Sequence, residues 1–258
     1  MLLAIDSGNT NVVFAVYDGE TLRGVWRCAN DPTRTADEYV VWLRQLMAIK
    51  DIPLSEITNC IIASVVPQGL FNLVSLCERY FGGHPLVVGE EDVDLGFKVL
   101  IDRPEQVGAD RLANVVSAFN RYGGPAILID FGTATTFEVM DVDGNYCGGV
   151  IAPGINLSAE ALHMASAQLP RIRIEPTDEV IGKATIPAMK SGIFWGYIGM
   201  IEGLVLRIRK EYAAGEMKVV ATGGLASLFA ESTDVIDHTD RELTIRGLLE
   251  IYQRNSDA

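Results

Sequence analysis

Two segments of the chain share one pattern, and each carries an aspartate into a glycine-containing turn. An apolar run leads to Asp6 near the N-terminus and to Asp130 near the middle, and Gly8 or Gly132 follows two residues later. Small hydroxyl or amide residues and an alternating strand come next, as in a β-hairpin. The two segments are LLAIDSGNTNVVFAVYDG at 2–19 and AILIDFGTATTFEVMDVDG at 126–144.

These residue types suit the binding of a metal-bound phosphate. Glycine permits positive φ and close backbone approach, so that amide N–H groups can face phosphate oxygens, and Ser, Thr and Asn side chains add donors. A carboxylate repels phosphate directly but can hold it through Mg²⁺, which prefers carboxylate, water and phosphate oxygens. A single Asp-x-Gly is most often an ordinary hairpin turn. Its recurrence favours a metal–nucleotide clamp, with both turns facing one cleft.

The spacing of the two aspartates predicts a duplicated domain. They lie 124 residues apart (130 − 6), close to half of the 258 residues. A chain of this length can form two domains of about 130 residues each. Because no low-complexity linker separates the halves, we expect a tight hinge near Pro104–Gly108, with domains at 1–106 and 107–258.

The elements expected in each half follow the order of a ribonuclease-H-like domain, which predicts the α/β class. Thr35 and Glu38 form a capping-box pattern that opens an amphipathic helix ending near Ile49. The other elements expected in the first half are a hairpin over 2–18, strands at 21–30, 60–66 and 86–88, and a helix at 68–80. In the second half we expect strands at 126–130, 136–142, 146–151 and 218–222, and helices at 110–122, 158–167, 192–213, 225–231 and 242–253.

Composition excludes several classes of partner. The net charge of −13 and the absence of a Lys/Arg cluster argue against nucleic acid or an anionic membrane as the main partner. The apolar stretch 192–208 is interrupted by Glu202 and Arg207, so we expect no membrane span and a soluble, cytoplasmic protein. The four cysteines are scattered, with no C-x-x-C spacing, which argues against a zinc site.

Taken together, four blocks of sequence carry a resemblance to a known family. They are DSGNTN at 6–11, VGADRLAN at 107–114, DFGTATTFEVMD at 130–141 and GGVIAPG at 148–154. With GKAT at 182–185 and ATGGLA at 221–226, the chain resembles the type III pantothenate kinases from end to end. These belong to the acetate kinase, sugar kinase, Hsp70 and actin superfamily. The resemblance implies duplicated ribonuclease-H-like (actin-like ATPase) domains with a central nucleotide cleft.

The resemblance also implies an activity. Members of this family use ATP to phosphorylate the primary hydroxyl of pantothenate, giving 4'-phosphopantothenate in the first step of coenzyme A biosynthesis. They are cytoplasmic homodimers that require Mg²⁺ with ATP and a monovalent cation, K⁺ or NH₄⁺. No nucleic acid or membrane partner is implied.

Residue roles carry over to the matching positions. Asp110 resembles the proton acceptor and Asp130 the monovalent-cation ligand. The residues similar to the family's ATP-binding positions are Asp6, Ser7, Gly8, Asn9, Thr10, Asn11, Val12, Val13 and Thr133. Those similar to its pantothenate-binding positions are Gly108, Ala109, Asp110, Arg111 and Thr185.

The residues themselves agree with these roles but leave alternatives open. Asp110 falls in the first turn of an expected helix, whose dipole would keep a carboxylate ionised, as a general base must be. Arg111 could pair with a substrate carboxylate. Alternatively, Asp110 could be only a helix-capping acid and Arg111 only a surface cation. Gly223-Gly224 could lie where this superfamily binds adenosine, or could simply form a close strand-to-helix turn. The helix over 192–208 suits packing or a dimer surface.

One position departs from the family pattern. Ile101 stands where members commonly have a tyrosine, three residues before Pro104, so a hydrogen bond worth about 1 kcal/mol would be missing. This favours, as an alternative, a related kinase for another hydroxylated acid or sugar. A binding or regulatory protein that has lost the chemistry is a third possibility. The presence of Asp6, Asp110 and Asp130 together weighs against it.

Overall fold

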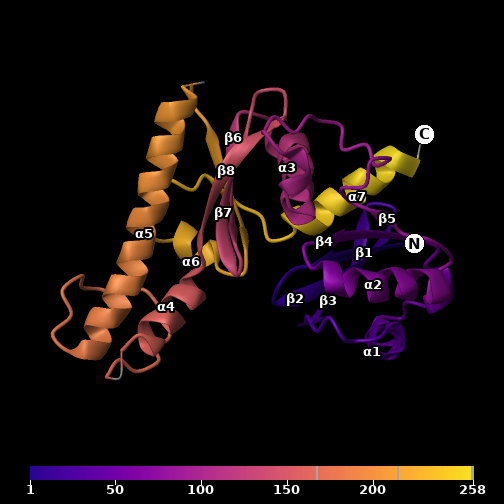
Figure 1. The fold of residues 1–258 in the computed structure, drawn as a ribbon, viewed down its shortest axis with the longest axis horizontal. Helices are drawn as coiled ribbons and strands as arrows, with labels where there is room; N and C mark the ends of the chain where they lie inside the picture. The colour runs from indigo at the N-terminus through magenta and orange to yellow at the C-terminus, as the bar shows by residue number, and fades with distance from the viewer. Residues whose placement is uncertain (167, 214, 257–258) are drawn as a thin grey trace. The chain divides into compact units, whose positions relative to one another are not determined.

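The structure, a computed structural model, describes residues 1–166, 168–213 and 215–256, which fall into two compact units (Figure 1). Unit 1 comprises Met1–Arg121 and the C-terminal segment from Glu242, and unit 2 comprises Tyr122–Arg241. Each unit contains one five-stranded sheet.

The sheet of unit 1 has the strand order β3-β2-β1-β4-β5. Its strands are β1 (Leu2–Ser7), β2 (Asn11–Asp18), β3 (Thr21–Ala29), β4 (Asn59–Ser64) and β5 (Leu86–Val87). Its helices are α1 (Ala36–Ala48), α2 (Pro67–Tyr80), α3 (Ala109–Tyr122) and α7 (Leu243–Ser256), with short 3₁₀ turns η1 (Leu54–Glu56) and η2 (Pro104–Gln106).

The sheet of unit 2 has the order β8-β7-β6-β9-β10. Its strands are β6 (Ala126–Phe131), β7 (Ala134–Met140), β8 (Tyr146–Pro153), β9 (Lys218–Gly223) and β10 (His238–Thr239). Its helices are α4 (Ile155–Met164), α5 (Thr185–Tyr212), the long orange helix of Figure 1, and α6 (Ala226–Ala230).

The two sheets have the same topology, which confirms the predicted duplication. In each, the central strand (β1 or β6) pairs antiparallel with the strand that follows it in the chain and parallel with the strand after the crossover (β4 or β9). Even the irregularities match, because the register between the second and third strands shifts at Val16/Tyr17 in unit 1 and at Val139/Met140 in unit 2. The fold is therefore α/β with duplicated ribonuclease-H-like halves.

The division between the units differs from the expected boundary at residues 106 and 107. The apolar faces of α3 and α7 both pack on one face of the unit 1 sheet, through Ala109 and Leu112 on α3 and Ile245 and Leu248 on α7. Helices α1 and α2 cover the opposite face. The expected boundary assigned α3 to the second domain, with the strands that follow it in the chain. Its buried side chains instead pack against the sheet of unit 1.

The contact between α3 and α7 requires a glycine. A Cβ atom at Gly247 would lie 2.0 Å from the carbonyl oxygen of Ala113, which is backbone and cannot move aside. The glycine therefore lets the two helices cross at very short distance, although glycine costs helix stability relative to alanine.

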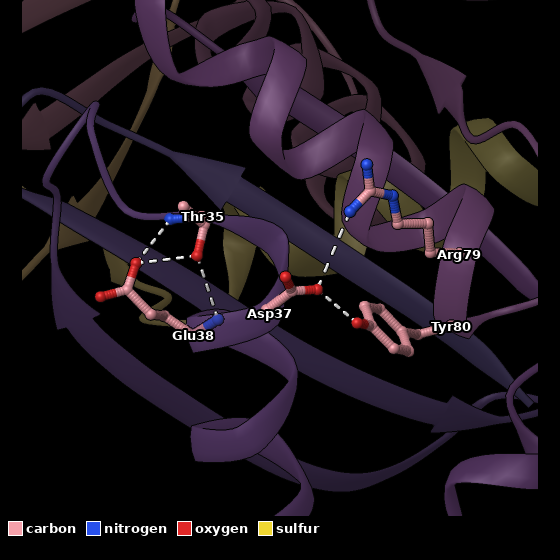
Figure 2. A network of polar contacts seen from close by, with 5 residues as sticks. All are labelled: Thr35, Asp37, Glu38, Arg79 and Tyr80. Carbon is pink, nitrogen blue, oxygen red and sulfur yellow. Dashed lines mark hydrogen bonds and ion pairs between the residues drawn. The ribbon is translucent and has the colours of Figure 1, made fainter.

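Helix α1 begins with the predicted capping box, shown in Figure 2. The Thr35 hydroxyl accepts from the Glu38 N–H at 3.3 Å, and the Glu38 carboxylate accepts from the Thr35 N–H at 2.8 Å. Also in the first turn of α1, Asp37 accepts a hydrogen bond from the Tyr80 hydroxyl and lies 3.8 Å from the Arg79 guanidinium. These contacts join the start of α1 to the end of α2.

Two helices of unit 2 differ from expectation. Helix α5 begins at Thr185 rather than Gly192, since Pro187 is tolerated in a first turn. Helix α4 begins and ends about three residues earlier than expected; Ala167, the expected last residue, lies outside the described residues. By length and composition α5 could span a bilayer, but its buried side chains, including Phe194, Ile198 and Ile201, form the core of unit 2.

Candidate functional site

The first aspartate turn lies at the C-terminal end of β1, where strand directions change. The Gly8 N–H donates to the Asn11 carbonyl oxygen at 3.0 Å and closes the turn between β1 and β2. Asp6 pairs with Val13 on antiparallel β2 and with Ala63 on parallel β4. Ligands of open α/β sheets bind at such carboxyl ends, where the strand order reverses.

The second turn repeats this geometry in unit 2 with one residue fewer. The Gly132 N–H donates to the Ala134 carbonyl oxygen at 3.1 Å. Asp130 pairs with Thr136 on β7 and with Thr222 on β9. The same backbone therefore places a carboxylate at the same edge of each sheet.

The turn glycines do not have the conformation that their residue type suggested. Neither Gly8 nor Gly132 has positive φ. A Cβ atom would lie no closer than 3.5 Å to another atom at Gly8 and 3.4 Å at Gly132, which is ordinary contact. Their amides close the turns, so phosphate would meet the donors of the residues that follow, such as Asn9 or Thr133.

The surroundings of Asp130 fit a cation that is bound by oxygen atoms. Thr136 and Thr222, its register partners on either side, share its face of the sheet, because paired residues of neighbouring strands point to the same side. The Thr136 hydroxyl is buried and has no hydrogen-bond partner among the described residues. Carboxylate and hydroxyl oxygens are ligands for hard cations.

Of the two glycines near the Asp130 carboxylate, Gly223 makes room for it. A Cβ atom at Gly223, whose φ is +90°, would lie 2.6 Å from Asp130 Oδ1, and one at Gly132 would lie 3.9 Å from it. Within the described residues, no group of three or more His, Cys, Asp or Glu side chains could hold a metal ion. A cation at Asp130 would therefore rely on hydroxyl and backbone oxygens for the rest of its shell.

The register partners of Asp6 are apolar, unlike the two threonines beside Asp130. In the positions that Thr136 and Thr222 hold beside Asp130, Asp6 has the apolar Val13 and Ala63. Neither can coordinate an ion. A metal at Asp6 would keep more of its water, as Mg²⁺ does in phosphate sites.

Asp110 stands at the start of α3, next to the first turn. The Arg111 N–H donates to Asp110 Oδ1 at 2.8 Å. A Cβ atom at Gly108 would lie 2.5 Å from Asp110 Oδ1 and 3.2 Å from Val65 Cγ1. Val65 in turn donates its N–H to the Ser7 carbonyl oxygen at 3.0 Å. Val65 thus links Gly108 to the end of β1, and this places Gly108–Arg111 near the first turn in unit 1.

Burial raises the pKa of the Asp110 carboxyl, and this outweighs the lowering by the Arg111 N–H and the positive charge of Arg111. The helix N-terminus was expected to keep the group ionised. Desolvation opposes that, so the carboxylate is a stronger base than an exposed aspartate, and its ionised form is costly to the fold.

Unit 2 holds Thr133 and Thr185 far apart. The carbonyl oxygen of Thr133, in the second turn, accepts a hydrogen bond from the Gly154 N–H at 3.2 Å. Thr185 is the exposed first residue of α5, 12 residues (197 − 185) before Tyr197, which hydrogen-bonds to Thr135. That separation is about 18 Å of helix. The structure does not bring Thr185 to the second turn within this unit.

Sequence reasoning missed Thr136 and Thr222. Thr136 could have been found by pairing the predicted hairpin residue by residue, since it lies opposite Asp130. Thr222 could not, because β9 follows β6 by about 90 residues and only the parallel pairing makes them neighbours.

Comparison with known proteins shows the family of this chain. A family model described as type III pantothenate kinase matches residues 2–207. A protein named type III pantothenate kinase from Paramagnetospirillum magneticum is 65% identical over 256 residues, which cover 99% of this chain and 98% of the relative. The chain belongs to the type III pantothenate kinase family.

Solved structures support the fold of this type III pantothenate kinase family member. A putative Baf family transcriptional activator from Campylobacter jejuni has a TM-score of 0.63 at 18% identity, covering 99% of this chain and 100% of that one. A putative 2-dehydro-3-deoxygalactonokinase from Sinorhizobium meliloti has a TM-score of 0.59 at 13% identity, covering 98% and 96%. At these identities the likeness concerns the fold alone.

The glycine beside Asp130 gives a prediction for stability. Gly223→Ala should lower the free energy of unfolding by about 3 kcal/mol, because the new Cβ meets Asp130 Oδ1 and the Phe131 carbonyl oxygen at 2.6 Å in a positive-φ conformation. Thermal and urea unfolding measure this. Gly224→Ala is the control, since nothing lies within 4 Å of its Cβ. Equal stability of the two variants would contradict the packing described here.

Proposed function

We propose that the protein transfers the γ-phosphoryl group of ATP to the primary hydroxyl of pantothenate, forming 4'-phosphopantothenate in the first step of coenzyme A biosynthesis. The observation that carries the proposal is the position of Asp110, held at the start of α3 beside the first aspartate turn. Membership of the family supports the choice of substrate.

The roles of individual residues follow from phosphoryl-transfer chemistry. The loose transition state needs orientation and charge neutralisation more than a strong nucleophile. Asp110 orients the pantothenate hydroxyl and accepts its proton, and Arg111 pairs with the pantothenate carboxylate. The backbone of Gly108 and Ala109 lines the same end of α3, and Thr185 is a further pantothenate contact.

The first turn, from Asp6 to Val13, binds the phosphates of ATP. Thr133 is a further ATP-binding residue, a role that rests on family membership alone. Bound Mg²⁺ would neutralise phosphate charge and be held through Asp6. The exposed Asn9, Thr10 and Asn11 offer amide and hydroxyl donors at the open end of the turn.

A monovalent cation, K⁺ or NH₄⁺, binds at Asp130, with Thr136 and Thr222 as further oxygen ligands. The buried Thr136 hydroxyl supports this, since a buried polar atom without a partner carries a desolvation cost that an ion would offset.

The protein acts as a cytoplasmic homodimer, with α5 at the interface. One side of α5 carries Gly192, Gly196 and Gly199, with nothing within 4 Å of where their Cβ atoms would be. Exposed Leu206 continues this side. Two copies of such a helix can approach closely.

Replacement of the base gives the first test. Asp110→Asn should reduce pantothenate-dependent ADP release from MgATP at least 100-fold, on the order expected for a lost general base.

The Asp110→Asn substitution should not lower the free energy of unfolding near pH 7. Burial raises the pKa of the Asp110 carboxyl, so its contribution to stability is present below the unfolded pKa and lost as pH rises through the folded pKa. Near-normal turnover would remove Asp110 from this role. Turnover of another hydroxylated acid, but not of pantothenate, would contradict the substrate.

The cation site gives a second test. Thr136→Val should raise the K⁺ concentration for half-maximal activity about tenfold and abolish stabilisation by K⁺ relative to Na⁺ in thermal unfolding without nucleotide. Thr239→Val, at an exposed position of the same sheet, is the control. An unchanged K⁺ response of Thr136→Val would exclude this hydroxyl as a ligand.

The dimer interface gives a third test. Gly196→Glu places a charge on the open side of α5 and should yield monomers in light scattering after size exclusion. Phe71→Glu, at an exposed position on α2, should leave the assembly unchanged. A dimer that persists in Gly196→Glu would exclude this side of α5.

A further inference from the structure

The segment that follows β3 holds the first turn at two points, both through Asn30. The Asn30 side-chain amide donates to the Gly8 carbonyl oxygen at 2.6 Å. The Asn30 backbone N–H donates to the Thr10 carbonyl oxygen at 2.9 Å. Asn30 is half-buried, so the first of these bonds is partly shielded from water.

These two bonds fix the direction of two other groups. In a trans peptide the C=O and the following N–H point in opposite directions within one rigid plane. Holding the Gly8 carbonyl towards Asn30 therefore turns the Asn9 N–H away from Asn30. Holding the Thr10 carbonyl does the same for the Asn11 N–H. Asn30 thus orients two donors of the first turn, although it lies about 20 residues away in sequence.

The second copy of the hairpin shows which of these bonds is special to the first. Asn11 pairs with Ala29, and Ala134 pairs with Pro153, so Gly154 is the structural counterpart of Asn30. The backbone bond is repeated, since the Gly154 N–H donates to the Thr133 carbonyl oxygen at 3.2 Å.

The side-chain bond has no counterpart in the second copy. Gly154 has no side chain, and a Cβ atom there would lie 2.7 Å from the Gly132 carbonyl oxygen. The second turn is one residue shorter, and the chain at Gly154 approaches it directly. In the longer first turn, the amide of Asn30 spans the extra distance.

The segment that carries Asn30 is itself anchored. The Asp31 carboxylate accepts from the Thr33 N–H at 2.9 Å, and the Asn72 side chain on α2 donates to the Pro32 carbonyl oxygen at 3.3 Å. The capping box at Thr35 ends the segment. The backbone that carries Asn30 is therefore held in place by hydrogen bonds of its neighbouring residues.

We propose that Asn30 is a positioning residue for the nucleotide: it fixes the peptide planes of the first turn so that the Asn9 and Asn11 N–H groups face the phosphates. This rests on the proposed function in one respect, the binding of ATP phosphates at the first turn.

The test is Asn30→Ala in the full-length protein. The KM for ATP and the dissociation constant for MgADP, by calorimetry, should rise about fivefold to tenfold, the usual effect of one lost hydrogen bond. The KM for pantothenate should not change. Asn30→Asp, of the same shape, should bind MgADP more weakly still, because a carboxylate cannot donate to Gly8 and repels phosphate. Asn72→Ala removes one bond to the neighbouring Pro32 but leaves both Asn30 bonds to the turn in place, so it should bind as wild type.

Two results would overturn the proposal. One is unchanged MgADP binding in folded Asn30→Ala, and the other is an equal loss in Asn72→Ala. If Asn30→Ala does not fold, Asn30→Asp with normal MgADP affinity would overturn it as well. Calorimetry with MgADP needs no turnover. Wild-type protein that binds MgADP but phosphorylates no pantothenate would refute the proposed substrate, while a weaker Asn30→Ala would still support the role of Asn30.

Discussion

The change of strand direction at β1 and at β6 is the constraint on which the rest of the structure depends. Each central strand has an antiparallel neighbour on one side and a parallel neighbour on the other. The hairpin turn and the end of the parallel strand therefore meet at one edge, and the last residues of the central strand face both. Asp6 and Asp130 occupy this edge, where an ion or phosphate can approach both a carboxylate and backbone amides.

Duplication gives two copies of this edge, and side chains make them different. Asp130 lies between two threonines, whereas Asp6 lies between a valine and an alanine. Hydroxyl groups can replace the water around an ion that is bound directly. Apolar neighbours leave the ion its water. The same backbone thus gives an ion two hydroxyl neighbours beside the carboxylate in one unit and two apolar neighbours in the other.

Glycines allow close packing around the Asp110 and Asp130 carboxylates. They are not the glycines of the two turns, which the sequence had suggested for that role. Gly8 and Gly132 were expected to supply positive φ but do not, and their amides serve to close the turns. Gly108 and Gly223 instead allow the backbone to approach the Asp110 and Asp130 carboxylates. Burial raises the pKa of the Asp110 carboxyl. The group is therefore a stronger base than an exposed aspartate, and its ionised form lowers the stability of the fold.

The sequence by itself determined the duplicated hairpins, the capping box at Thr35, most helices and the α/β class, because these depend on local periodicity and turn chemistry. It also predicted roles for Asp6, Asp110 and Asp130, through two repeated motifs and a family resemblance, and these roles stay predictions. Tertiary structure decided that α3 and α7 join the first sheet, that Thr222 lies beside Asp130, and that Asn30 holds the first turn. Each of these is a contact between segments distant in sequence. Hydrophobic periodicity and composition describe one segment at a time, so they carry no information about which strand or helix becomes its neighbour.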